Sequence, residues 1–329
     1  MGGMLTVVSD RPEPSLQHLP VTVFSSVMGI GGLSLAWRRA THVWDFPVWP
    51  SQLLFWIALT VFVVIGAAYA AKTMRYPAAV GSELRHPIRM AFAPTITISL
   101  LILATAGSDL MTPVARVAWW VGGVAHLAAT VLVVTEWVGR EDIMLTQVTP
   151  AWFIPVVGNV VTPLGASSIG SVEFGWIAFG IGIVFWLALL PLLLYRLLLH
   201  EHPLPSKLLP TLAIFIAPPA VAMLSWQQLT GNHGDPASRI LFAAALMFIA
   251  LLLAQFARLR TIPFALPYWA YTFPMAAGTA AAIASAGDLP SIGYDVVAIV
   301  LLSVTTLLVV VVSALTLRAA GRGEICVPE

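Results

Sequence analysis

The chain has 329 residues, of which 59% are hydrophobic and only 9% are charged, and its formal net charge is +1. Soluble globular domains carry roughly 25% charged residues, so this composition excludes a surface that faces mainly water and predicts one that faces lipid. No basic tract is present, and a nucleic-acid partner is therefore not expected. The single cysteine, Cys326, excludes an intramolecular disulfide and indicates no thiol-based site.

The first part of the chain is polar and does not resemble a cleaved signal peptide. Residues 1–19 contain Pro12 and Pro14 and lack the order of basic and then apolar residues that such a peptide shows. We therefore interpret 1–19 as a cytoplasmic tail, 20–319 as one transmembrane domain and 320–329 as a second cytoplasmic tail.

Ten apolar segments are long enough to cross a bilayer as helices, since one crossing needs about 20 apolar residues. In chain order they are 20–39, 51–72, 88–107, 113–135, 150–168, 174–197, 208–227, 238–257, 265–285 and 293–318. They are continuous and longer than the alternating segments of about ten residues that form barrel strands. The sequence therefore predicts an all-α integral membrane protein of ten spans.

The placement of basic residues agrees with this count. With ten spans both termini lie on one side, and that side holds twelve of the sixteen lysines and arginines. The other side holds Arg38, Arg39, Arg116 and Arg239. Because basic residues collect in cytoplasmic loops, we predict a multi-pass protein of the cell inner (plasma) membrane with both termini in the cytoplasm.

The odd-numbered and even-numbered spans differ in composition. Even-numbered spans such as 51–72 consist mostly of Leu, Ile, Val, Ala and Phe, and they can face lipid. Odd-numbered spans carry proline, glycine and hydroxyl or amide residues, such as Pro94 and Thr97 in the third span and Asn159 and Pro163 in the fifth.

Proline inside a span removes a backbone donor and clashes with the carbonyl four residues earlier. Pro163 thereby frees the carbonyl of Asn159, and Pro274 frees that of Ala270. Such carbonyls are tolerated where they are buried in protein or line a wet cavity. We therefore predict five helical hairpins, with kinked odd-numbered helices inside around a central conduit. The alternative is that the small and hydroxyl residues only permit close helix packing.

Ionisable residues, which mark ion pathways inside membranes, are nearly absent from the spans. His126 in the fourth span is the one deep titratable group, and its alternative role is hydrogen-bonded packing. Arg89, Glu136 and Arg196 lie near span ends, where we expect their side chains to reach the cytoplasmic interface.

The motifs of enzymes and pumps are missing from the sequence. It shows no metal-ligand spacing, phosphate loop, nucleophile elbow or dinucleotide fingerprint. We therefore predict no enzyme activity, catalytic residue, cofactor or metal site. A conduit without ionisable groups predicts passive permeation, with selectivity set by pore diameter and lining dipoles.

Three segments resemble elements of the family of TehA and the plant slow-type anion channels, which includes tellurite-resistance, malate and sulfite transport proteins. They are FSSVMGIGGLSLAWRRA (24–40), PAWFIPVVGNVVTPLGAS (150–167) and PYWAYTFPMAAGTAA (267–281). The span count and the interrupted odd-numbered helices extend this resemblance over nearly the whole chain.

The resemblance implies a homotrimer in the lipid bilayer, with one pore inside each protomer and five hairpins in quasi-fivefold arrangement around it. It also implies that Phe273 occludes the pore and that Gly29 leaves room for its ring, with Phe264 as the rival for the occluding role. The pore lining is then expected to include Ser25, Pro94, Thr97, Asn159, Pro163, Pro218, Pro274 and Gly278.

Three functions remain in competition. The first is a gated anion channel that passes small monovalent anions. The second is a proton-coupled secondary transporter of dicarboxylate, sulfite or tellurite oxyanions, which would depend on His126. The third is a membrane scaffold or sensor without transport, and the polar inner helices argue against it.

Overall fold

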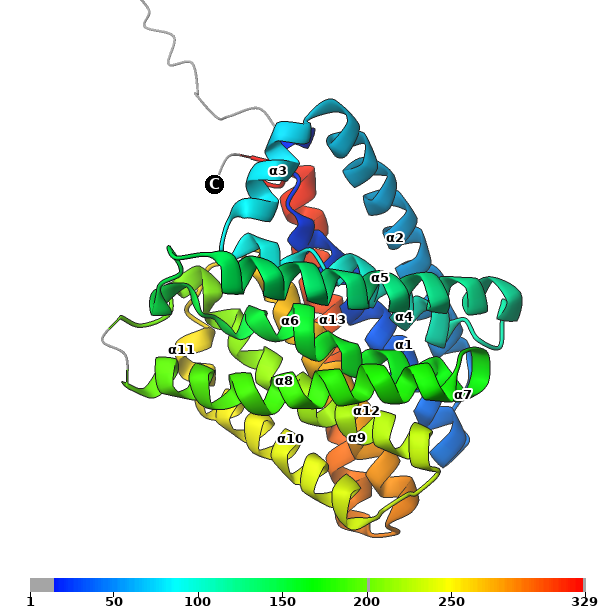
Figure 1. Ribbon diagram of the computed structural model, residues 1–329. Coiled ribbons are helices and arrows are strands. Elements are labelled where there is room, and N and C mark those ends of the chain that lie inside the picture. Colours follow the sequence, from blue (N-terminus) through cyan, green and yellow to red (C-terminus); the bar gives the residue numbers. More distant parts are fainter. Residues whose placement is uncertain (1–14, 200–201, 328–329) are drawn as a thin grey trace, which may run out of the picture.

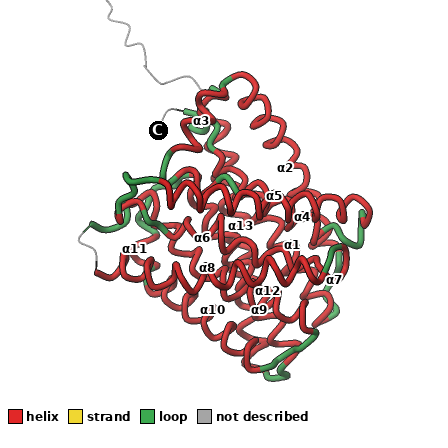
Figure 2. The backbone as a smooth tube through the Cα atoms, viewed as in Figure 1, coloured by secondary structure: helices red, strands yellow, loops and turns green. Residues whose placement is uncertain are grey.

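The structure, a computed structural model, describes residues 15–199 and 202–327. These residues form helices joined by short loops, and no strand occurs among them (Figure 2). Eight of the helical segments are long and apolar enough to cross a membrane. This confirms the predicted all-α integral membrane protein. The remaining two predicted spans are helical but are not among those eight.

Five long helices form the outside of the molecule. They are α2 (Trp49–Arg75), α5 (Thr112–Gly139), α8 (Val172–Leu199), α10 (Pro236–Ala254) and α13 (Ile292–Gly321). Each is one continuous α-helix, and only 11–33% of its most apolar stretch is buried in the protein. Their exposed side chains are largely apolar, so the solvent that fits these helices is lipid.

The segments predicted as odd-numbered spans lie inside, and they share a different construction, because each begins as a 3₁₀ helix and continues as an α-helix. They are η2 (Val21–Phe24) with α1 (Ser25–Trp44), η3 (Arg89–Phe92) with α4 (Thr95–Ala106), η5 (Pro150–Trp152) with α6 (Phe153–Val157), η6 (Gly158–Gly165) and α7 (Ala166–Ile169), η7 (Ser206–Ile216) with α9 (Ala217–Thr230), and η8 (Leu266–Tyr271) with α12 (Thr272–Asp288). The third, fifth and seventh spans are 72–89% buried. The predicted division into inner and outer helices is thus visible in their burial.

Proline explains much of the irregular winding. Pro94 separates η3 from α4, while Pro163 and Pro210 lie inside η6 and η7. Proline cannot donate to the α-helical ladder and its ring collides with the preceding turn. The 3₁₀ segments η6 and η7 have 8 and 11 residues, longer than the three or four residues usual for such helices.

The inner segments contact one another in a closed ring. α1 contacts α4, α4 contacts η6, η6 contacts α9, α9 contacts α12, and α12 contacts α1. Each outer helix packs on the inner segment that precedes it, α2 on α1, α5 on α4, α8 on α6 and η6, α10 on α9, and α13 on α12. Figure 1 shows α1, α6 and α12 enclosed by the long helices.

Both ends of the described chain lie on one side of the ring, together with the short helices η1 (Leu16–His18) and α3 (Pro77–Arg85). The amide of Ser15 donates to the carbonyl of Cys326 at 2.9 Å. Residues 1–14 and 328–329 of the predicted tails lie outside the described part of the chain. α13 extends to Gly321, two residues beyond the predicted end of the membrane domain.

A buried ion pair fastens this end of the molecule. Lys72 Nζ lies 2.8 Å from the carboxylate of Glu83, and both side chains are buried. The same carboxylate accepts from the amide of Val21 at 2.7 Å and the hydroxyl of Tyr69 at 3.0 Å, and Lys72 Nζ also donates to the carbonyl of Leu19 at 2.7 Å. These bonds hold the segment that leads into α1 against α2 and α3.

Candidate functional site

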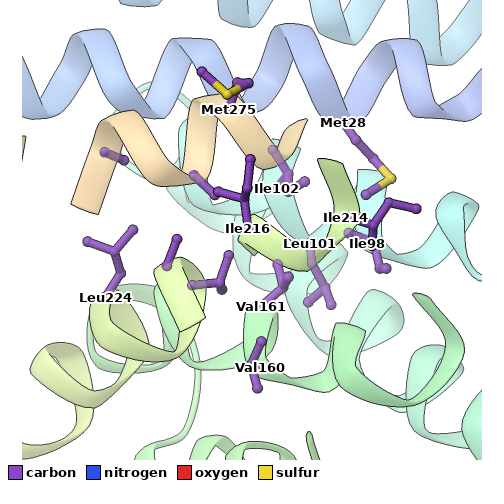
Figure 3. Close-up of a cluster of buried hydrophobic side chains, with 14 of the residues drawn as sticks. Met28, Ile98, Leu101, Ile102, Val160, Val161, Ile214, Ile216, Leu224 and Met275 are labelled. Atoms are coloured by element: carbon purple, nitrogen blue, oxygen red, sulfur yellow. The ribbon is translucent and has the colours of Figure 1, made fainter. Parts of the chain in front are cut away.

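A cavity of about 60 Å³ lies at the centre of the ring. All five inner spans contribute to its wall, and α2, α5, α8, α10 and α13 contribute nothing. Its lining is mainly aliphatic and aromatic. Figure 3 shows Met28, Ile98 and Ile214 close together on three different inner segments, and all three line this central cavity.

Phe273 is a partly buried aromatic residue in the wall of the central cavity. It is the second residue of α12 and precedes Pro274, just where η8 passes into α12. Its ring packs on α1, because a Cβ built on Gly32 would lie only 3.0 Å from Cδ2 of Phe273. The absence of a side chain at Gly32 therefore lets the ring lie against the backbone of α1.

The glycine beside the Phe273 ring differs from the one that the sequence resemblance indicated. A Cβ built on Gly29 would lie 2.0 Å from Thr272 Oγ1 and 3.3 Å from the ring of Trp269. Gly29 therefore permits the close approach of α1 to the start of α12, and the contact expected between Gly29 and Phe273 is made by Gly32. The two glycines are three residues apart on one helix and face successive residues of α12.

The other candidate lining residues divide into two groups. Ser25, Pro218 and Pro274 line the central cavity together with Phe273. Five others are not part of its lining: Pro94, Thr97, Asn159, Pro163 and Gly278. Gly278 instead faces the side chains of Ile249 in α10 and Ile216 in η7.

The polar side chains outside the cavity tie the inner helices to α5. Thr97 Oγ1 lies 2.8 Å from His126 Nδ1. The side-chain amide of Asn159 donates to Thr130 Oγ1 at 2.8 Å, and the Thr130 hydroxyl in turn contacts the carbonyl of Pro155 at 2.7 Å. Buried polar groups need such partners, so these residues turn toward α5 rather than toward the cavity.

His126 belongs to this packing layer. Its side chain is fully buried, and it does not line the central cavity. Its Nε2 has no hydrogen-bond partner and lies beside Gly158, where a built Cβ would approach it to 2.7 Å. The geometry therefore matches the packing role that the sequence left open.

A wider cavity of about 510 Å³ lies on the side of the chain termini, and we call it the near-side cavity. It shares Ser25, Phe92 and Ala270 with the central cavity, so the two adjoin. Charged side chains of both signs line it: Glu83, Arg89, Lys207 and Glu324.

A cavity of about 340 Å³ lies toward the opposite ends of α1 and α12, and we call it the far-side cavity. Its lining includes Arg38, Arg39 and His42 and no acidic residue. Arg38 donates to the Thr105 carbonyl and to Ser108 Oγ, each at 3.0 Å. The Arg39 side chain interacts electrostatically with Asp288, without a close ion pair among the described residues.

The far-side and central cavities share no lining residue. Along α1, Gly32 lies between Met28 of the central cavity and Leu35 of the far-side cavity. Along α12, Phe273 lies on the central cavity and Ala280 on the far-side one. The contact of Gly32 with Phe273 therefore lies between the central cavity and the far-side cavity.

Several residues of this arrangement were missed or misjudged from sequence. The aliphatic lining was missed because only hydroxyl, amide, glycine and proline residues were taken as lining candidates. Glu136 is exposed and Arg89 lines the near-side cavity. The Arg196 side chain is only 2% exposed, so it is buried among other residues of the protein and does not extend freely from the surface as expected.

Comparison with known proteins agrees with this geometry. The family model for SLAC1, voltage-dependent anion channel, matches residues 18–317. The chain is 28% identical to the S-type anion channel SLAH2 of Arabidopsis thaliana over 327 residues, which cover 96% of this chain and 62% of that protein. It is 26% identical to the guard cell S-type anion channel SLAC1 of Arabidopsis thaliana over 317 residues, covering 93% of this chain and 57% of that protein.

A bacterial relative is matched more evenly. The chain is 26% identical to the tellurite resistance protein TehA homolog of Haemophilus influenzae over 262 residues, which cover 78% of each protein. The chain spans less than two thirds of the length of the plant channels it matches. These relatives are named as channels and a resistance protein, not as enzymes. With 300 of its 329 residues matched by one family model, the chain belongs to the SLAC1 family of voltage-dependent anion channels.

Proposed function

We propose that the chain is a gated anion channel that passes small monovalent anions through a pore inside each protomer. The observation that carries this proposal is the central cavity, to which all five inner spans contribute and which lies between two wider cavities. Phe273 occludes the pore at its narrowest level, beside Gly32. Its position next to Pro274, where the helix changes its winding, allows the ring to be redirected without moving the whole of α12.

The pore is formed by ten spans arranged as five hairpins with quasi-fivefold symmetry. The closed ring of contacts among the inner segments and the pairing of each outer helix with its inner neighbour support this arrangement. Length and apolarity identify eight of these spans. The other two are α1 and the segment formed by η8 and α12.

The charge distribution supports a selectivity among anions that depends on how strongly each anion is hydrated, and not on a charged binding site in the pore. The central cavity has no charged residue in its lining, so an anion that enters it must shed water without a cation to replace it. Weakly hydrated anions lose least and pass most readily. Arg38 is paired with Asp109, and Arg39 raises the local anion concentration at the far-side cavity, because a cation at a pore mouth attracts anions.

A proton-coupled transporter is the competing proposal, and the position of His126 argues against it. A relay would need a titratable side chain in contact with the permeating ion, whereas His126 packs between α4 and α5 outside the cavity. Assembly as a homotrimer, placement in the plasma membrane and cytoplasmic termini stay predictions.

The decisive experiment compares anion currents of the wild type and Phe273→Ala in the same planar bilayer or oocyte system. We expect a nearly silent wild type and a current at least tenfold larger in Phe273→Ala, independent of any proton gradient. Phe264→Ala is the matched control, because Phe264 lines only the near-side cavity. A silent Phe273→Ala variant, together with wild-type uptake that requires a proton gradient, would replace the channel with the transporter.

A further inference from the structure

An arginine that is buried without a counterion among the described residues lies away from the pore, near the end of α8. Arg196 is among the largest fully buried side chains of the described chain, and its Nε has no hydrogen-bond partner. The described residues offer its guanidinium no ion pair or side-chain hydrogen bond. The partial negative charge at the C-terminus of α8 offsets only about half a charge.

A buried and uncompensated charge is costly. Removing one partner of a buried ion pair strongly destabilises a protein, because the remaining charge has lost its compensation. A guanidinium is always protonated and cannot escape this cost by giving up its proton. We therefore expect the buried guanidinium of Arg196 to be paired with an anion that is not part of the described chain.

Arg196 lines a pocket that could hold such an anion. The pocket has a volume of about 270 Å³ and lies between α8, η7 and α10. Arg258 is the second cation in its lining, and Gln255 is a further polar group. No acidic residue of the described chain lies in its wall, so the described lining carries a positive charge.

The rest of the wall is apolar and partly open to the lipid side. Leu198 and Leu251 both line the pocket, and both are exposed on the outer helices α8 and α10. Pro203 and Leu204 at the pocket adjoin Pro205 and Lys207 of the near-side cavity in sequence, so the pocket lies at the membrane face where the chain termini lie. A cationic pocket with leucine walls at that level matches a phosphate that carries acyl chains.

We propose that this pocket binds the headgroup phosphate of an anionic phospholipid. The phosphate lies against the guanidinium groups of Arg196 and Arg258, because guanidinium forks match phosphate oxygens in charge and geometry. The acyl chains leave along Leu198 and Leu251 into the bilayer. The lipid thereby joins α8 to η7 and α10, and it stabilises the end of the fifth span's hairpin against the seventh.

The test measures thermal unfolding of the purified, delipidated protein in neutral detergent. Phosphatidylglycerol, phosphatidylcholine and inorganic phosphate are added separately to the wild type, Arg196→Met, Arg258→Gln and Arg260→Gln. Arg260 is the matched control, since it is an exposed arginine two residues from Arg258 that does not line the pocket. Native mass spectrometry of the same samples counts the lipids retained per protomer.

We expect phosphatidylglycerol to raise the Tm of the wild type and Arg260→Gln by more than about 3 °C, as ligand linkage predicts. Arg196→Met should lose this gain and one retained lipid, yet match or exceed the wild-type Tm without lipid because its unpaired charge is gone. If Arg196→Met does not fold, Arg258→Gln should still show a smaller gain than Arg260→Gln.

Two outcomes would overturn the proposal. One is an equal gain from phosphatidylglycerol in the wild type and in the variants of Arg196 and Arg258. The other is a gain from inorganic phosphate as large as that from the lipid, which would assign the pocket to a free anion.

Discussion

Gly32 and Phe273 meet across the contact between α1 and α12, and the ring of Phe273 occupies the space that a side chain at position 32 would take. A Cβ built on Gly32 would lie 3.0 Å from Cδ2 and 3.6 Å from Cε2 of that ring. The proposed gate residue Phe273 can therefore lie here only because position 32 of α1 is a glycine, which has no Cβ.

Gly32→Ala should reduce the current of the channel through Phe273. The added methyl pushes the ring away from α1 and toward the pore. The small current that the wild type carries should therefore fall by roughly threefold or more. This change corresponds to about 0.7 kcal/mol, which lies within the usual cost of displacing a packed side chain. In the Phe273→Ala background the same change should have little effect. Bilayer recordings of both single variants and the double variant measure this coupling. An equal fall in both backgrounds would show that the methyl acts elsewhere.

Gly29→Ala should lower the stability of the fold more than it changes the current through the gate. Its Cβ would lie 2.0 Å from Oγ1 and 2.6 Å from Cβ of Thr272, so α1 and α12 must separate, at a cost of about 1–3 kcal/mol for overpacking. The measurement is the Tm in detergent. Gly66→Ala is the control, because Gly66 lies in α2 with open space around it, and that variant should be neutral or slightly more stable. Equal Tm values for the two variants would contradict this reading of the contact.

Arg39→Gln should reduce anion current in a manner that depends on salt. Arg39 lines the far-side cavity, and although Asp288 attracts its charge, it forms no close ion pair with an acidic residue among the described residues, so we expect it to attract anions. In the conducting Phe273→Ala background we expect a roughly two- to tenfold fall at 10 mM salt and little change at 1 M, since the Debye length shrinks from about 30 Å to about 3 Å.

Arg116→Gln provides the comparison for Arg39→Gln. Arg116 is exposed at the start of α5 and does not line the cavity. A loss of current that is the same at both salt concentrations, or that Arg116→Gln reproduces, would remove Arg39 from the role of attracting anions.

Glu83→Gln should destabilise the end of the molecule where α2, α3 and the N-terminal segment meet. It leaves Lys72 buried without its counterion, at a cost of about 3–5 kcal/mol. Thermal unfolding should report a lower Tm, and the double variant Lys72→Met with Glu83→Gln should recover much of it. Asp142→Asn breaks the exposed pair with Arg140 and should have little effect. If Glu83→Gln lowers the Tm only slightly, water must reach the Lys72 ammonium group.

The helices of this protein were largely predictable from its sequence. Apolar runs such as 51–72 and 293–318 correspond to α2 and α13, and the ends agree within about three residues. The reason is that a lipid environment demands long apolar helices with satisfied backbones. Proline and glycine likewise identified the inner spans, because residues that disturb a helix are tolerated where protein surrounds them.

The faces of those inner helices could not be predicted in the same way. Thr97 and Ile98 are neighbours, yet Thr97 reaches His126 in α5 while Ile98 lines the central cavity. Successive residues of a helix point about 100° apart, so a polar residue on an inner span turns toward a pore or toward an outer helix according to how that helix is rotated. Thr97 and Asn159 were predicted to line the pore because they are polar, but both side chains face α5.

The sequence by itself determined that this is an integral membrane protein, which of its helices are exposed and which are enclosed, and the family to which it is similar, because each of these depends on composition and local order. Only the tertiary structure decided that Gly32 and not Gly29 receives the Phe273 ring, that aliphatic side chains surround the central cavity, and that Arg196 is buried without a counterion among the described residues. These features depend on the rotation and spacing of helices that are far apart in the chain, and such contacts follow from the packing of the whole ring.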